Sequence, residues 1–171
     1  MFELKPIHRD AIPAALAKAE RYRLLNEPRA AESICRDVLR TDPRNQIALV
    51  TLLLALTDQF TRRRGPEITS AQEIVQSLES EYERDYYDGV VCERWGKAQL
   101  RRNAPSQIGC DWLREAMSRF EKAEAIRPAG NDDAILRWNA CARLIMRHEP
   151  EGADASGGAD GGVFDEDVPL V

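Results

Sequence analysis

Cysteine and histidine, the residue types that most often bind metals or act as nucleophiles, are scattered along this sequence. The two histidines are His8 and His148, and successive cysteines lie 57, 18 and 31 residues apart, at Cys35, Cys92, Cys110 and Cys141. A zinc site needs pairs of such ligands close together, as in C-x-x-C, and the sequence has no such pair. We therefore expect no metal and no cofactor, and four reduced thiols buried on helices.

Other reactive side chains also have structural explanations. A nucleophile would need one of the two histidines as its base, and both lie at the ends of the expected domain. The acidic pair Asp132-Asp133 suits the first turn of a helix, where carboxylates interact favourably with the helix dipole. Tyr86-Tyr87 is interpreted as another helix start. The paired glycines lie in an acidic C-terminal segment with no lysine beside them for phosphate. We predict that the protein is not an enzyme.

A basic run, Arg62–Arg64, offers guanidinium groups that bind phosphate well. Nucleic-acid binders, however, usually carry a basic face that extends over many residues. Residues 1–148 hold 24 Lys+Arg against 22 Asp+Glu, a net charge of +2, which argues against nucleic acid as a partner. A nucleic-acid-associated regulator that uses this loop is kept as an alternative.

Charge and glycine divide the 171 residues into a body and a tail. Residues 149–171 hold seven acidic residues, no basic residue and five of the ten glycines, so we expect a disordered acidic tail. Residues 11–148 are expected to form one helical domain after a lead-in over 1–10. The longest apolar run, Ile47–Leu56, is too short to cross a bilayer, which predicts no membrane partner. The start, MFELKPIHRD, lacks the plan of a secretory signal, so we expect a cytoplasmic protein.

Apolar residues recur with a helical period through most of the body, and no alternating strand pattern competes with it. Pro28, Pro43 and the polar stretch TRRRGPEIT interrupt the pattern. These signals predict an all-α fold of about seven helices in antiparallel pairs, over residues 11–25, 28–40, 44–60, 69–83, 86–102, 109–127 and 131–147. The third helix is apolar on every side, which predicts an internal position.

The spacing of small and bulky residues carries a family resemblance. Tetratricopeptide repeats follow W-x2-L-G-x2-Y, then A-x3-F, then P, over about 34 residues. The corresponding residues here are Ala19-x2-Tyr22-x8-Ala31-x3-Cys35-x7-Pro43, Ala116-x3-Phe120-x2-Ala123-x4-Pro128, Trp138-x2-Cys141-Ala142-x2-Ile145 and the pair Trp95-Gly96. The sequence therefore resembles a tetratricopeptide repeat (TPR) protein over roughly residues 11–147, of the small uncharacterised bacterial type. Long loops at 61–69 and 103–110 explain why the pattern repeats at intervals longer than 34 residues. In the second repeat, Leu53 stands where the pattern has a small residue.

The resemblance implies a right-handed superhelix of antiparallel helix pairs, with a concave groove lined by the first helix of each pair. The groove positions that it implies are Leu16, Glu20, Arg23, Val50, Leu54, Asp58, Glu93, Lys97, Arg101, Asn139 and Arg143. Some TPR proteins bind the C-terminal carboxylate of a peptide with a clamp of lysine, asparagine and arginine. At the corresponding positions of this sequence only Arg94 has a matching residue type, which argues against a C-terminal carboxylate as the ligand.

From this groove we expect an adaptor or scaffold that binds a peptide or protein partner. A structural subunit that forms a weak homodimer is a further alternative. We also hypothesise that residues 163–171, which combine three acids with apolar side chains, return to the groove of their own chain.

Overall fold

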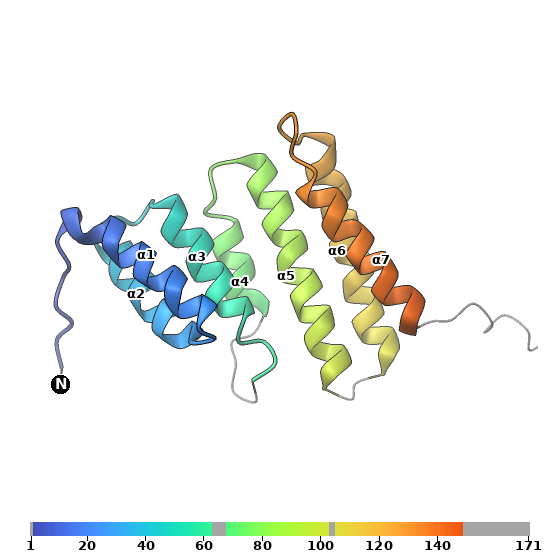
Figure 1. Cartoon of the computed structure of the whole chain (residues 1–171), viewed down its shortest axis with the longest axis horizontal. Helices are drawn as coiled ribbons and strands as arrows, with labels where there is room; N and C mark the ends of the chain where they lie inside the picture. Colours follow the sequence, from blue (N-terminus) through green and yellow to red (C-terminus); the bar gives the residue numbers. More distant parts are fainter. Residues whose placement is uncertain (1, 63–67, 103–104, 149–171) are drawn as a thin grey trace, which may run out of the picture.

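The computed structural model describes residues 2–62, 68–102 and 105–148, and it has no β-strand among them (Figure 1). After a 3-10 turn at Arg9–Ala11, these residues form seven α-helices: α1 (Ile12–Leu24), α2 (Pro28–Thr41), α3 (Gln46–Thr57), α4 (Ile68–Val75), α5 (Glu81–Arg101), α6 (Ser106–Ala125) and α7 (Asp133–His148). The predicted all-α fold is confirmed for this part of the chain. The expectation of a disordered tail concerns residues 149–171, which lie outside the described residues.

Capping residues explain where several helices begin. Pro28 is the first residue of α2, a position at which its missing N–H is not needed. The side chain of Asn45 accepts a 3.0 Å hydrogen bond from the backbone N–H of Ala48 and so caps α3. The side chain of Asn131 accepts a bond of the same length from the N–H of Asp133, at the start of α7.

The boundary between α4 and α5 differs from the prediction. Helix α4 ends at Val75 rather than near residue 83, and α5 begins at Glu81 rather than near residue 86. The reason is Ser80, whose side chain accepts a 3.3 Å hydrogen bond from the N–H of Glu83 and caps α5. Tyr86 therefore does not start a helix, as the sequence suggested, but packs inside α5 against the ring of Phe120.

The helices stand side by side in chain order, each packed against the next (Figure 1). Successive helices run in opposite directions, so α1, α3, α5 and α7 all run the same way and end at the same edge of the molecule. Helix α3 also contacts α1 and α5 directly. It is covered on both sides, which confirms the predicted internal position of this apolar helix.

Small residues allow α5 and α6 to pack closely. A Cβ atom on Gly96 would lie 2.9 Å from the carbonyl oxygen of Gly109, closer than real Cβ contacts come. A Cβ atom on Gly89 would lie 2.6 Å from a ring carbon of Phe120, which is fully buried. The two helices can therefore approach at these points only because both positions in α5 are glycine.

Candidate binding site

A solvent-open pocket of about 350 Å³ lies where α1, α3 and α5 end together. We call it the basic pocket, and it is lined by Arg23, Leu24, Asn26, Thr57, Asp58, Phe60, Thr61, Arg94, Lys97 and Arg101. Four of these side chains are cationic and one is anionic. The pocket is therefore built from three helices that run in parallel and are separated in the chain by their antiparallel partners.

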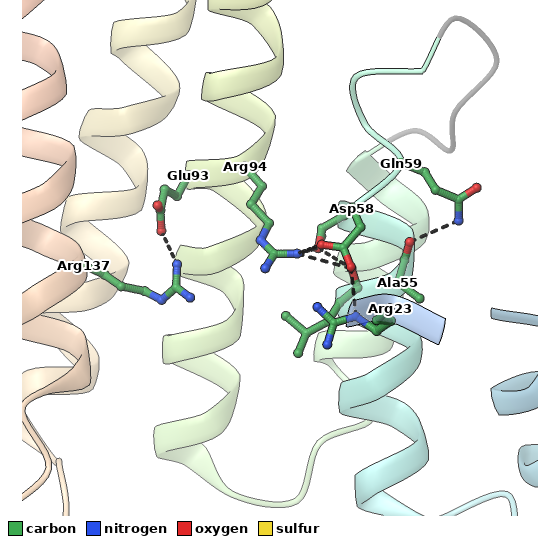
Figure 2. A network of polar contacts seen from close by, with 9 residues as sticks. Arg23, Ala55, Asp58, Gln59, Glu93, Arg94 and Arg137 are labelled. Carbon is green, nitrogen blue, oxygen red and sulfur yellow. Dashed lines mark hydrogen bonds and ion pairs between the residues drawn. The ribbon is translucent and has the colours of Figure 1, made fainter. Parts of the chain in front are cut away.

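Asp58, at the end of α3, joins the three helices. One carboxylate oxygen accepts a 2.9 Å bond from Nε of Arg23 on α1, and the other accepts a 2.5 Å bond from Nη1 of Arg94 on α5 (Figure 2). Nη1 of Arg94 also lies 2.7 Å from the hydroxyl oxygen of Thr57. Burial lowers the pKa of the Arg94 guanidinium, and the charge of Asp58 opposes that shift. Asp58 thus holds the two arginines in fixed positions at the pocket wall.

A second carboxylate, Glu93 on α5, is paired with a side chain of α7. Its residue is only 2% exposed, and one of its carboxylate oxygens accepts a hydrogen bond from Lys97. The other oxygen accepts a 2.7 Å bond from Nη1 of Arg137 (Figure 2). Nε of Arg137 donates a 2.9 Å bond to the hydroxyl of Tyr86. Burial acts to lower the pKa of Arg137, but Glu93 and Tyr86 outweigh it, so the pKa is raised. Glu93 therefore binds α7 to α5 through a paired, buried charge.

The pocket and its supporting pairs carry more positive than negative charge. Asp58 pairs with Arg23 and Arg94, and Glu93 pairs with Lys97 and Arg137, while Arg101 adds a fifth cation at the pocket. Arg101 is exposed and, within the described residues, no ion pair or hydrogen bond of its side chain is found. Guanidinium and ammonium groups held in this way bind carboxylates and phosphates through charge-assisted hydrogen bonds. The geometry therefore suits an anionic ligand.

Four of the eleven groove positions expected from the sequence line this pocket: Arg23, Asp58, Lys97 and Arg101. Four others lie elsewhere on the first helices of the pairs: Glu20 is exposed on α1, Val50 is half-buried on α3, Asn139 is half-buried on α7 and Arg143 is exposed on α7. None of these four lines the basic pocket.

Two of the remaining three positions are buried, and the third, Leu54, is partly buried. Leu16 is 9% exposed because it packs with Ile12, Val38 and Ala48 in the core between α1, α2 and α3. Leu54 packs against the side chains of α5. Glu93 is buried under its two cations. The expectation that Leu16 and Glu93 offer their side chains to a ligand is therefore corrected, since neither reaches the surface.

Sequence reasoning missed three residues of this site. Thr57 was not considered, Arg94 was judged only as part of a carboxylate clamp, and Arg137 was not singled out. Thr57 and Asp58 are the first polar pair after the apolar run of α3, which is a signal for a polar site at the end of that helix. Arg137 lies 44 residues beyond Glu93, and no local pattern indicates their pairing.

The other candidate residues bring no second site together. Arg62 is described and partly exposed, while Arg63 and Arg64 lie outside the described residues. All four cysteines are buried on helices, as predicted. Burial raises the pKa of Cys35 to about 11 and those of Cys92 and Cys141 to about 12, so these thiols stay protonated at neutral pH.

Among the described residues, no three side chains of His, Cys, Asp or Glu come close enough to hold a metal ion. No described helix has both the length and the hydropathy needed to span a bilayer. Comparison of the whole sequence with protein-family models, with curated proteins and with solved structures gives no significant match.

Proposed function

We propose that the protein is an adaptor or scaffold of the TPR type, in which stacked antiparallel helix pairs form a right-handed superhelix. In this proposal an acidic peptide segment of a protein partner binds across α1, α3 and α5. The observation that carries it is the basic pocket, with its surplus of cations at the common end of these three helices. An anchored carboxylate, Asp58, keeps two of those cations oriented, so little side-chain freedom is lost when a ligand binds.

The packing of the repeat-like residues supports the TPR part of the proposal. Four small residues of the pattern are fully buried, namely Ala19, Ala31, Ala116 and Ala123. Phe120, which matches the aromatic residue of the pattern, is also fully buried. In a TPR superhelix such small residues let the paired helices pack closely, and the first helix of each pair faces the ligand. The basic pocket belongs to the first helices of three successive pairs.

The size of the pocket favours a peptide side chain or two over a whole small-molecule substrate. Its volume of about 350 Å³ is near the lower end for small-molecule sites, and it is open to solvent. Leu24, which lines the pocket, and Leu25 next to it are both exposed, so the apolar surface continues beyond the pocket. An acidic segment with flanking apolar residues would use both features.

The test is selection of binding peptides from a displayed random library, followed by fluorescence anisotropy with the purified protein. We expect acidic peptides whose affinity falls about tenfold with Arg101→Glu, because one close attraction becomes a repulsion. The matched control is Arg29→Glu, an equal charge change at an exposed position on α2, and it should leave affinity within about twofold. Equal losses in both variants, or tighter binding of an oligonucleotide than of any selected peptide, would contradict the proposal.

A further inference from the structure

We infer that residues 163–171 of the same chain, VFDEDVPLV, are an intramolecular ligand of the basic pocket and compete there with the partner. The inference rests on the pocket as a peptide-binding site, but it needs no external partner. These residues lie outside the described part of the chain and follow α7, the last described helix. Three observations carry it: the charges of the segment and the pocket are complementary, both carry apolar side chains beside those charges, and the linking residues are long enough to reach the pocket.

The charges are complementary. The segment contains Asp165, Glu166 and Asp167 in succession and no basic residue. The pocket offers Arg101 and the exposed part of Lys97, beside two arginines already held by Asp58. A carboxylate that approaches Arg101 meets no competing acid at that side chain within the described residues.

Apolar side chains flank the acids in the segment and the cations in the pocket. Phe164 precedes the three acids, and Val168 and Leu170 follow them. In the pocket, Leu24 is 83% exposed, the most exposed leucine of the described residues. A purely solubilising segment would not need these large apolar residues, whereas a ligand for a mixed surface would.

The topology brings the segment to the right edge of the molecule. Helix α7 runs in the same direction as α1, α3 and α5, so it ends at His148 on the edge where the pocket opens (Figure 1). Glu93 and Arg137 bind α7 directly to α5, which lines the pocket. At about 10 Å between neighbouring helices, the pocket lies about 20 Å from the end of α7. The residues that follow His148 therefore start from the same edge of the molecule at which the pocket opens.

The linking residues are long enough to cover this distance. Residues 149–162 supply 14 residues rich in glycine, and such a chain has a root-mean-square span of about 20 Å. A linker matched to its span gives an effective concentration in the millimolar range. A segment with an intrinsic dissociation constant of about 1 mM would then occupy the pocket about half of the time or more. External ligands would bind about two- to fivefold more weakly than to the open pocket.

The experiment uses the full chain with a nitroxide label on a cysteine introduced by Val171→Cys. The native thiols do not compete for the label, because all four are buried and the pKa values of Cys35, Cys92 and Cys141 are raised to about 11 or 12. Paramagnetic broadening of backbone amide signals then reports which surface the segment visits. We expect selective broadening at residues 57–61 and 97–101, and little broadening at the end of α2, which lies at the opposite edge from the pocket.

Two matched triple variants separate docking from general attraction. Asp165→Asn, Glu166→Gln and Asp167→Asn together should remove the selective broadening and strengthen the binding of a selected acidic peptide about two- to fivefold. Glu151→Gln, Asp154→Asn and Asp160→Asn together remove the same charge from the linking residues and should change neither result. Broadening spread evenly over the surface, or the same response in both triple variants, would overturn the inference.

Failure here is distinguishable from failure of the proposed function. If the segment does not dock, selected peptides should still bind and still lose affinity with Arg101→Glu. If instead the pocket binds no acidic peptide at all, both the broadening at residues 97–101 and the anisotropy signal should be absent.

Discussion

The contact between Gly89 on α5 and Phe120 on α6 gives a sharp test of how these helices pack. A Cβ atom at position 89 would lie 2.6, 2.7 and 3.0 Å from three carbons of the Phe120 ring. The ring is rigid and fully buried, so it cannot move aside without displacing its neighbours. Gly89→Ala should therefore introduce overpacking of about 1–3 kcal/mol.

The same substitution has an opposing local effect. Alanine stabilises the interior of a helix by about 1 kcal/mol relative to glycine. In the wild-type protein the two effects nearly cancel or leave a net loss of up to about 2 kcal/mol. In the Phe120→Ala background, which itself costs about 3–5 kcal/mol, the overpacking is gone and Gly89→Ala should stabilise by about 1 kcal/mol. The structure thus predicts that the effect of Gly89→Ala becomes more favourable by about 1–3 kcal/mol when the ring is removed.

Urea unfolding followed by circular dichroism at 222 nm measures the unfolding free energies of the wild type, the two single variants and the double variant. The matched control is Phe60→Ala, which removes an equally buried ring from a different cluster, where it packs against Trp95. The effect of Gly89→Ala should be the same in that background as in the wild type. If Phe120→Ala also left the effect of Gly89→Ala unchanged, the packing of α5 on α6 described above would be wrong.

Three further predictions concern single residues. Asp58→Ala should cost about 1–3 kcal/mol of unfolding free energy because it leaves two half-buried arginines unpaired, whereas Glu79→Ala, which breaks an exposed ion pair, should cost less than about 1 kcal/mol; equal costs in urea unfolding would argue against the bridging role. Ser80→Ala should cost about 0.5–1 kcal/mol by the same assay, since α5 loses its cap, and no loss would mean that α5 does not begin there. The pKa of the Cys35 thiol is raised to about 11 in the folded protein, so its contribution to stability is present below pH 9 and is lost as the pH rises from about 9 to 11. Cys35→Ala should therefore make the unfolding free energy less dependent on pH in that range. If the pH dependence of the unfolding free energy were the same in both proteins, the assigned pKa would be wrong.

The sequence predicted the helices well where local signals decide their ends. Pro28 and Asn45 act on their own helix starts, and the helices there agree with the prediction within a few residues. The boundary between α4 and α5 was misjudged, although Ser80 and Glu83 have the spacing of a capping box. Both lie in a run of polar and charged residues, where the apolar period gives no second signal for the break.

The site was only partly predictable, because periodicity indicates which side of a helix a residue faces but not which other elements pack against that side. Arg23, Asp58 and Lys97 were assigned to a common face, and the structure brings them into one pocket. Leu16 was assigned to the same face, but α2 and α3 cover it. Glu93 was expected in the groove because the repeat resemblance puts a groove position there, but it is buried and paired with Lys97 and with Arg137, which lies 44 positions away.

The most direct measurement of the central proposal is amide hydrogen exchange or chemical-shift mapping with an acidic peptide selected against the full chain. Binding across the basic pocket should change signals at residues 23–26, 57–61 and 94–101, on α1, α3 and α5. The exposed residues of α2 and α6 should stay unchanged. Changes confined to α2, α4 or α6, with none at residues 94–101, would contradict the proposal that this pocket receives the partner.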